Sequence, residues 1–256
     1  MDIVCPVCKN KLVRYDKSYK CINNHNFDIA KQGYLNLNMH NSQSTGDNSL
    51  MINARNAFLN NKHYDFLLKE INKRINLNDC LVDLACGEGY YTSKFKSNNK
   101  IGIDLSKQGL KIASRNDPKT LYLLNSIFKN PLEDKSADKI ITIFAPIAKD
   151  EIKRILKDNG EFILVKPDMY HLYELKEALY ENPYKNEIED IEIDGLKLNE
   201  EIKISNVQTL DSEDLHNLFM MTPYFNTTSI EDKKKLEKIT SLEVTFAFIV
   251  DIYKKN

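Results

Sequence analysis

Three cysteines and one histidine near the start of the chain have the spacing of a zinc site. Cys5 and Cys8 form a CxxC pair, twelve residues separate Cys8 from Cys21, and three separate Cys21 from His25. Two tight turns can each bring two such ligands to one ion, and four ligands fill the tetrahedral shell of zinc. We therefore predict a structural zinc ion whose binding folds the surrounding segment. The alternative is that the four residues are unrelated.

The charge of the chain is balanced overall and uneven locally. Lys+Arg number 36 against 37 Asp+Glu, a net charge of -1, which neither supports nor excludes a nucleic-acid partner. Residues 1–34 carry six basic residues against three Asp, a local excess of +3. The aromatic residues of this segment could stack on bases or could pack around the zinc site in place of a core. They are Tyr15, Tyr19, Phe27 and Tyr34.

Cysteine use and hydropathy indicate a reducing compartment and no membrane segment. Three of the five cysteines cluster before residue 22, which favours metal binding over disulfides. Cys80 and Cys86 are interpreted as small buried hydrophobic residues. No apolar run approaches the roughly 20 residues of a membrane helix, and the N-terminus lacks the apolar centre of a signal peptide. We predict a cytoplasmic protein.

From residue 80 onward the sequence alternates between strands and helices. Such alternation predicts an α/β fold with a mostly parallel sheet joined by right-handed crossovers. The predicted strands are 80–86, 100–106, 120–126, 139–146 and 161–167. The predicted helices start at 87 and cover 108–115, 149–156 and 171–181. Two long, partly alternating segments, 191–204 and 242–253, predict antiparallel strands at the C-terminal end.

The composition divides the chain into three parts. Residues 1–35 are the zinc-binding module, and residues 36–49 are rich in Asn, Ser and Gly, which is typical of a linker. Residues 50–256 form the larger domain, and it opens with a helical stretch over 50–76 that breaks near Asn60. The module is too short and too poor in apolar residues to build a hydrophobic core alone.

A glycine loop follows the first strand of the larger domain. The pattern Asp83-x-Ala85-x-Gly87-x-Gly89 resembles the ExGxGxG loop of class I methyltransferases, with Ala85 in place of the usual first glycine. Glycines let the backbone approach a ligand closely. Asp104 closes the next strand, 17 residues after Gly87, where a carboxylate can accept both ribose hydroxyls of a cofactor. The spacing differs from that of NAD-binding loops. A doubly wound domain that binds another nucleoside, or none, is the alternative.

Later strand ends complete the predicted cofactor site. Asn125 and Ser126 end the third strand, where the adenine edge is expected, and Pro146 lies where a methyl group would be delivered. No Asn/Asp-Pro-Pro-Tyr motif occurs there, which argues against methylation of an exocyclic amine. The charged groups near this place are typical of solvated helix or loop edges, so no catalytic residue is assigned. They are Asp150, Glu151 and Lys166.

Taken together, these residues resemble the bacterial large-subunit ribosomal RNA (guanine-N1)-methyltransferases. The resemblance covers nearly the whole chain. It is carried by CPVC…C-x3-H-x-FD-x-AK-x-GY-x-NL, then GD-x3-M-x2-AR-x2-FL-x3-HY, LVDLACGEGYY, an Ala-Pro segment, HL-x-ELK and MTPY. It implies a class I methyltransferase (Rossmann-like) fold, S-adenosylmethionine as cofactor, and as substrate a guanine in a hairpin of the large (23S) ribosomal RNA. It also implies that the zinc module helps to recognise RNA and that a homodimer is possible.

The resemblance carries site residues over to this chain. The zinc ligands that it implies are Cys5, Cys8, Cys21 and His25. The cofactor-contacting positions that it implies are Tyr64, Gly87, Glu88 and His171. The chain departs from the family at Ala85 and at Ile147, where many members have Cys.

Transfer of a methyl group to guanine N1 has its own chemical requirements. Guanine N1 carries a proton at neutral pH, so a general base, or donors that stabilise negative charge on O6, would assist transfer. The target base must also be unstacked from its hairpin.

Two other functions remain open from the sequence. One is a methyltransferase that acts on a small molecule or a protein, and the other is a zinc-containing RNA-binding protein on an inactive methyltransferase fold.

Overall fold

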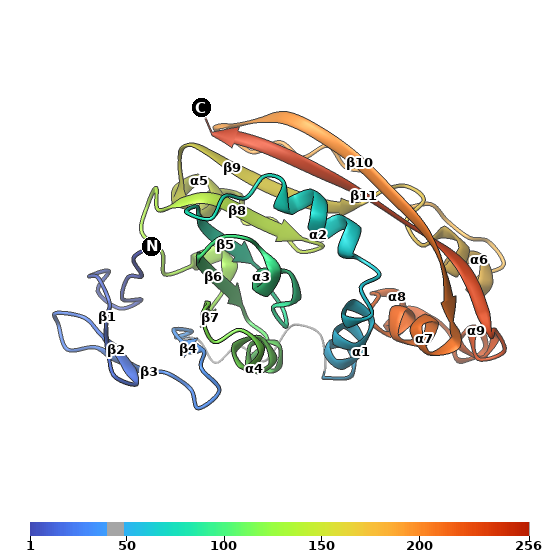
Figure 1. Cartoon of the computed structure of the whole chain (residues 1–256), viewed down its shortest axis with the longest axis horizontal. Coiled ribbons are helices and arrows are strands. Elements are labelled where there is room, and N and C mark those ends of the chain that lie inside the picture. Colours follow the sequence, from blue (N-terminus) through green and yellow to red (C-terminus); the bar gives the residue numbers. More distant parts are fainter. Residues whose placement is uncertain (40–48, 256) are drawn as a thin grey trace.

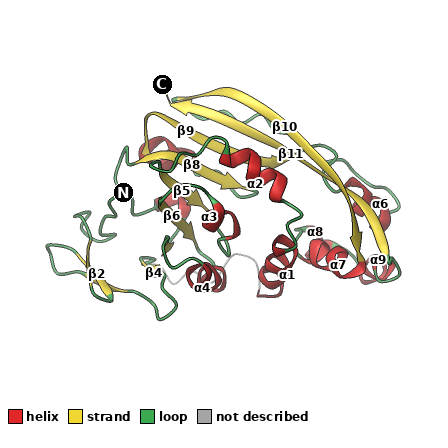
Figure 2. Ribbon diagram, in the orientation of Figure 1, coloured by secondary structure: helices red, strands yellow, loops and turns green. Residues whose placement is uncertain are grey.

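The computed structural model describes residues 1–39 and 49–255, and in these ranges eight strands form one sheet in the order β10-β11-β9-β8-β5-β6-β7-β4 (Figures 1 and 2). The six strands β4 to β9 are parallel to one another, and β11 pairs antiparallel with both β9 and β10. The mostly parallel sheet with antiparallel C-terminal strands is therefore confirmed. The strands are β4 (Leu35–Asn36), β5 (Cys80–Leu84), β6 (Asn99–Asp104), β7 (Leu121–Leu124), β8 (Ala137–Ile143), β9 (Leu156–Pro167), β10 (Leu196–Asp211) and β11 (Ser241–Lys255).

Helices join the parallel strands as the alternation predicted. They are α3 (Tyr90–Lys94), α4 (Lys107–Asn116) and α5 (Lys149–Ile155), with a short 3-10 helix η1 (Ile127–Lys129) between β7 and β8. The predicted helix after β9 is α6 (Tyr173–Leu179), which leads to the antiparallel strands. Two strands end earlier than predicted because the next residue takes a left-handed backbone. Ala85 has φ 64° directly after β5, and Phe144 has φ 52° directly after β8. Left-handed backbone cannot continue a strand, so the chain turns out of the sheet at both places.

The predicted helical stretch 50–76 is two helices. α1 (Ser49–Asn60) ends where the break was predicted, and α2 (Asp65–Asn72) follows a turn in which Lys62 has φ 68°. The buried positions of α2, Leu67, Leu68 and Ile71, recur at helical spacing and pack on the sheet.

Alternating side chains divide the core into two faces. On β5, Leu81 packs on one face with residues of α2, α6 and α7 (Ser212–Met220), while Val82 and Leu84 pack on the other with residues of α5. The period-2 alternation of a strand explains this division. All three side chains are fully buried. Complete burial of a Leu or Val side chain contributes roughly 1.5–3 kcal/mol.

The N-terminal segment folds as a small antiparallel sheet of β1 (Val13–Tyr15), β2 (Ser18–Lys20) and β3 (Asn26–Asp28). Its apolar side chains pack in a core that belongs mainly to the larger domain. Ile3 and Leu12 are buried in the same cluster as Val82 of β5. The backbone N–H of Val4 donates to the carbonyl of Pro131 at 2.7 Å, and Ile3 forms an antiparallel bridge with Leu132. This docking supplies the apolar contacts that so short a segment lacks.

The chain enters the main sheet immediately after this module. Leu35 and Asn36 form β4, the edge strand, and pair with Leu123 and Leu124 of β7. The predicted boundary between residues 35 and 36 therefore falls inside a strand. Most of the predicted linker 36–49 lies outside the described residues, which resume at 49. The division into three parts stays a prediction.

The C-terminal strands form a long hairpin whose far end carries helices. β10 and β11 sweep away from the sheet, and α7, α8 (Tyr224–Thr227) and α9 (Ile230–Leu236) gather at the end opposite the N-terminal module (Figure 1). Within the described ranges, every helix is too short or too polar to cross a bilayer.

Candidate functional site

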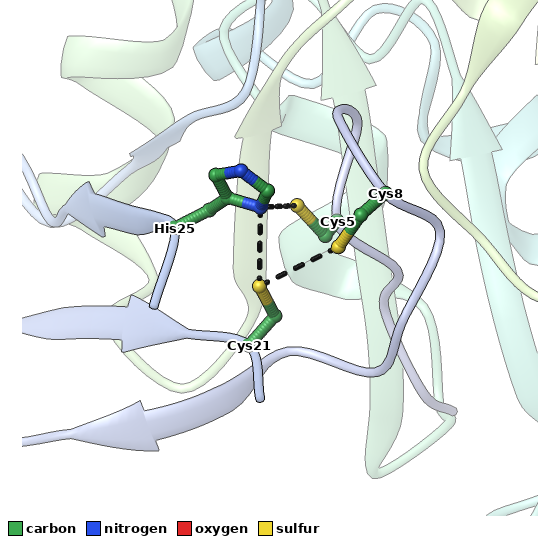
Figure 3. A group of neighbouring side chains, drawn as sticks. All are labelled: Cys5, Cys8, Cys21 and His25. Carbon is green, nitrogen blue, oxygen red and sulfur yellow. Dashed lines mark hydrogen bonds between the residues drawn. The ribbon is translucent and has the colours of Figure 1, made fainter. Parts of the chain in front are cut away.

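The four predicted metal ligands converge on one point of the N-terminal module (Figure 3). Their ligand atoms all lie within 4.8 Å of one another. Nδ1 of His25 is 3.3 Å from Sγ of Cys21 and 3.5 Å from Sγ of Cys5, and Sγ of Cys8 is 3.6 Å from Sγ of Cys21. Zn–S bonds of about 2.3 Å in a tetrahedron place two sulfurs about 3.8 Å apart. The donor set and its spacing therefore fit zinc.

Two tight turns hold the ligands. In the first, the N–H of Lys9 donates to the carbonyl of Cys5, and in the second the N–H of Asn24 donates to the carbonyl of Cys21. Lys9 and Asn24 both have left-handed backbone, with φ 63° and 61°. Asn24 lies between Cys21 and His25 and turns the chain so that the histidine faces the cysteine, while Lys9 closes the turn just after Cys8.

The environment also favours a metal-binding thiolate. The side chain of Asn10 donates to Sγ of Cys8 at 3.4 Å. This hydrogen bond, with the Asn10 backbone, lowers the pKa of the Cys8 thiol to about 5. A thiolate is the form of cysteine that binds metal.

A cavity of about 950 Å³ opens at the carboxyl ends of the parallel strands. Ligands bind at this edge in doubly wound sheets, and the volume lies at the upper end of the usual range for ligand sites. Two of the eight predicted cofactor residues, Gly89 and Asn125, do not line the cavity. The other six line it: Tyr64, Asp83, Gly87, Glu88, Asp104 and His171.

The two predicted residues outside the cavity act in the turns beside it. Gly89 has φ 75° at the start of α3, and a Cβ there would lie 2.7 Å from Cβ of Ala113, so only glycine fits between the loop and α4. Oδ1 of Asn125 accepts from the N–H of Ser126 at 2.8 Å. Their roles in cofactor binding stay predictions.

Asp104 ties the glycine loop to the end of β6. Its Oδ2 accepts from the N–H of Gly87 at 2.8 Å, and its Oδ1 accepts from the N–H of Ser106 at 2.6 Å. Gly109 of α4 packs so closely under the loop that a Cβ would lie 2.7 Å from the carbonyl oxygen of Gly87. The loop backbone is thus held before any ligand arrives, with the carboxylate at its rim.

Asp83 is the buried acid at the base of the loop. It is 3% exposed, and the hydroxyl of Thr92 donates to its Oδ2 at 2.5 Å. Burial raises the pKa of this carboxyl to about 7, against the lowering effect of the Thr92 hydrogen bond. Asp83 lines the cavity floor with a carboxyl that is largely protonated below neutral pH.

Arg55 is a cavity residue that reasoning from spacing missed. It lies on α1, and its Nη1 is 3.6 Å from Oε2 of Glu88, which is 4% exposed. Arg55 belongs to the AR-x2-FL pattern, so the signal was present as part of the family motif. The ion pair places a cation over the loop, where an anionic group of a ligand could meet it.

Aromatic side chains line the other half of the cavity. Tyr64 is buried, and its ring centroid lies 4.9 Å from that of Phe248 and 6.4 Å from that of Phe144. Phe144 is 43% exposed, and Phe128 is 59% exposed. Both line the cavity. Neither was singled out from the sequence: Phe144 belongs to a predicted apolar strand, where Phe is ordinarily core, and Phe128 follows a predicted strand without any motif around it. Two exposed phenyl rings at a cavity suit a flat, stacking ligand.

The three charged residues predicted near the place of methyl delivery do not lie together in the structure. Asp150 is exposed on α5 and does not line the cavity. Glu151 accepts from Arg154 at 2.7 Å and is engaged in that ion pair. Lys166 does line the cavity, and its Nζ is 2.8 Å from Oδ2 of Asp251, which is 1% exposed.

Of the aromatic residues in the N-terminal zinc module, some pack in the core and one is exposed, as needed for stacking on bases. Tyr34 is buried against α4, while Tyr19 and Phe27 pack partly on the core cluster that holds the zinc ligands. Tyr15 is 59% exposed. Packing therefore accounts for three of the four, and Tyr15 is available to a partner.

Comparisons with known proteins match two separate parts of the chain. A family model described as RlmA, N-terminal, a zinc ribbon, matches residues 3–39. A model described as a methyltransferase domain matches residues 75–221. The 23S rRNA (guanine(748)-N(1))-methyltransferase of Streptomyces fradiae is 32% identical over 186 residues, which are 68% of this chain and 66% of that enzyme. The aligned part thus spans just under two thirds of the relative.

Two further comparisons extend over more of the chain or concern its fold. YxjB of Bacillus subtilis, provisionally named a 23S rRNA (guanine-N(1)-)-methyltransferase, is 25% identical over 262 residues, covering 94% of this chain and 93% of that protein. The crystal structure of YcgJ from Bacillus subtilis superposes with a TM-score of 0.50 at 14% identity, covering 75% of this chain and 99% of that one. This last likeness concerns the fold alone.

Removal of a zinc ligand tests the metal centre. We expect the wild-type chain to bind one zinc ion and Cys21→Ser to bind almost none, because three ligands no longer close the shell. Residues 1–34 should then become sensitive to protease. Zinc content by mass spectrometry and limited proteolysis measure both effects. Cys80→Ser, outside the cluster, is the matched control and should keep its zinc. Full zinc content in Cys21→Ser would contradict the assignment.

The buried acid should make stability depend on pH. Because the folded-state pKa of Asp83 is raised from 3.8 to about 7, the folded protein holds this proton more tightly than the unfolded chain. The fold therefore loses stability as pH rises through this window. Relative to Asp83→Asn, which cannot titrate, the unfolding free energy of the wild type should fall by about 2 kcal/mol between pH 5.5 and pH 8. Urea denaturation at both pH values measures this, and a constant difference would refute it.

Proposed function

Since this chain belongs to the methyltransferase domain family and carries an N-terminal RlmA zinc ribbon, we propose that it methylates ribosomal RNA. The reaction is transfer of a methyl group from S-adenosylmethionine to N1 of a guanine in a hairpin of the large-subunit (23S) RNA. The names of the Streptomyces fradiae and Bacillus subtilis relatives support this substrate. The homodimer implied by the family resemblance stays a prediction.

One short segment carries the proposal because it joins the cavity to the zinc ribbon. Ile127 and Phe128 line the cavity. A few residues later, Pro131 and Leu132 make the backbone contacts that dock the ribbon. A base that enters the cavity would therefore come from a nucleic acid close to the ribbon. This continuity favours a large RNA substrate over a small molecule, which would not need the ribbon.

The cavity divides into a cofactor half and a substrate half. The glycine loop and Asp104 suit the nucleoside part of S-adenosylmethionine, because a carboxylate at that strand end accepts ribose hydroxyls. Tyr64, Glu88 and His171 are the other positions that the family resemblance assigns to the cofactor. The cofactor supplies an activated methyl group, and the chain must align N1 with it. Phe144, exposed at the end of β8, offers a surface on which an unstacked base can lie.

Primer extension tests the reaction directly. Unmodified ribosomal RNA is incubated with the zinc-loaded chain and S-adenosylmethionine, and methylation at guanine N1 blocks base pairing and stops reverse transcriptase. We expect a stop at one guanine of a large-subunit hairpin, absent when the cofactor is omitted. Calorimetry with the cofactor accompanies the assay. Cofactor binding without any stop would indicate a different substrate, and the absence of binding would indicate an inactive fold.

Charge reversal on the ribbon tests its role in RNA binding. Lys17 and Lys20 are exposed, so Lys17→Glu/Lys20→Glu should weaken binding of the RNA hairpin about tenfold or more. Because two phosphate contacts are lost, the slope of the logarithm of the RNA-binding constant against the logarithm of salt concentration should fall in magnitude by about 2. Cofactor affinity should not change. The matched control is Lys234→Glu/Lys238→Glu, two exposed lysines on and just after α9, the helix at the end of the molecule opposite the N-terminal module (Figure 1). Equal weakening by both pairs, or a parallel loss of cofactor affinity, would contradict a specific role for the ribbon.

A further inference from the structure

Helix α4 carries three basic side chains at a spacing of four residues. They are Lys107, Lys111 and Arg115, and we call them the α4 stripe. Residues four apart in a helix lie on one face, about 6 Å from one another along the helix axis. Lys107 and Arg115 are exposed, and Lys111 is partly exposed. The stripe therefore presents a row of positive charges to solvent.

The α4 stripe lies on the flank of the helix that meets the chain leaving the zinc ribbon. Lys107, Lys111 and Ser114 recur at i, i+4 and i+7, which is the spacing of one helix flank. Ser114 lies against this chain, because a Cβ added to Gly33 would be 3.3 Å from the Cβ of Ser114. Tyr34 packs in one cluster with buried residues of α4. The helix accordingly lies next to β4 (Figure 1).

The first residue of the stripe lies at the rim of the cavity. Ser106, which precedes Lys107, lines the cavity, and its hydroxyl accepts from the N–H of Gly109 at 3.0 Å to cap α4. On the other side, Lys31 is exposed on the chain that leaves the ribbon. Basic residues thus accompany the surface from the ribbon along α4 to the cavity.

The α4 stripe is unfavourable for the helix that carries it. Like charges four residues apart repel one another, and Lys107 in the first turn opposes the helix dipole, which favours acidic residues there. α4 contains no acidic residue, and no ion pair within the described ranges includes a member of the stripe. Lys100, just before the helix, is by contrast paired with Asp117 at 3.5 Å. Local stability therefore does not account for the stripe, whereas binding of a polyanion does.

Building on the proposed function, we propose that the α4 stripe binds the phosphate backbone of the RNA whose guanine enters the cavity. Cations about 6 Å apart can each meet a separate phosphate of one strand. Contacts with phosphates position a nucleic acid without reading its sequence. The stripe thus holds the RNA hairpin between the ribbon and the cavity, so that the target base faces the cavity.

The composition of this surface favours RNA over an acidic protein as the partner. Among the described residues of α4, no large hydrophobic side chain is exposed. Protein interfaces are built around apolar cores and are poor in lysine, whereas interfaces with nucleic acids are strongly basic. The α4 stripe has the second kind of composition.

Neutralisation of two members of the stripe tests the contact. Gln has nearly the helix propensity of Lys and Arg, so Lys111→Gln/Arg115→Gln removes two charges and leaves α4 intact. We expect the zinc-loaded variant to bind the RNA hairpin about tenfold more weakly at about 0.1 M salt. The slope of the logarithm of the RNA-binding constant against the logarithm of salt concentration should fall in magnitude by about 2. Fluorescence anisotropy across a salt series measures both effects.

The matched control is Lys234→Gln/Lys238→Gln, which removes two exposed lysines on and just after α9. It should bind the hairpin within about twofold of wild type, and both variants should keep their cofactor affinity. The thermal midpoint of Lys111→Gln/Arg115→Gln should not fall, because like-charge repulsion is relieved. Equal weakening by both pairs, or a lower midpoint of the stripe variant, overturns the inference. Unchanged RNA binding also overturns it and leaves an acidic protein as the partner of the stripe.

Phosphate ethylation identifies the RNA groups that the stripe contacts. Ethylation removes the charge of single phosphates, and those whose modification weakens binding to the wild type mark its contacts. One or two of them should lose their effect in Lys111→Gln/Arg115→Gln, because a contact that is already absent cannot be lost again. They should lie close to the target guanine, since the stripe begins at the cavity rim. An identical interference pattern in both proteins would show that the stripe touches no phosphate.

The proposed function and the role of the stripe fail separately. If the wild-type chain methylates the hairpin and the stripe variant binds it as tightly, the proposed function stands and the inference fails. If the wild-type chain methylates no RNA, the proposed function fails. The same salt series with a generic RNA stem-loop then still decides whether the α4 stripe binds phosphates.

Discussion

The carboxyl edge of the parallel sheet is the constraint on which the rest of the structure depends. Parallel strands all end at one edge, and there the chain must turn sharply toward the next helix. Three residues that make these turns or follow them, Ala85, Phe144 and Leu172, have left-handed backbone although none is glycine. All three line the cavity. These three turns thus bring left-handed backbone and ligand-facing side chains together at the carboxyl edge of the sheet.

Buried polar groups of the site are satisfied mainly by backbone. Asp104 accepts the backbone N–H groups of Gly87 and Ser106, and Nδ1 of His171 accepts the N–H of Ala247. Because the partners belong to regular structure, the side chains are oriented before a ligand binds, and preorganised groups need little rearrangement during reaction. Asp83 differs in that its partner is a hydroxyl, and burial leaves its pKa near neutrality. The same edge of the sheet therefore holds one fixed carboxylate and one titratable acid.

The zinc ribbon depends on two sources of stability outside hydrogen bonding. The metal ligands tie its turns together, and the larger domain supplies the core into which Ile3 and Leu12 are buried. A segment of this length buries too little apolar surface to fold alone, which is why small modules rely on metals. Its docking through residues 131 and 132 also explains how a small ribbon comes to lie beside the cavity. The strand β4 then carries the chain from the ribbon into the edge of the main sheet.

The sequence by itself determined the local features, because spacing and periodicity are local. The four zinc ligands, the alternation of strands and helices, the break near Asn60 and the acid-glycine pattern around Gly87 could all be read from it. Tertiary structure decided what depends on distant contacts. Only the fold brings Arg55 over Glu88, separates Lys166 from Asp150 and Glu151, and turns Phe144 outward at the end of an apolar strand. It also places Nδ1 of His171 against the backbone N–H of Ala247, a residue 76 positions further along the chain, which no local pattern could indicate.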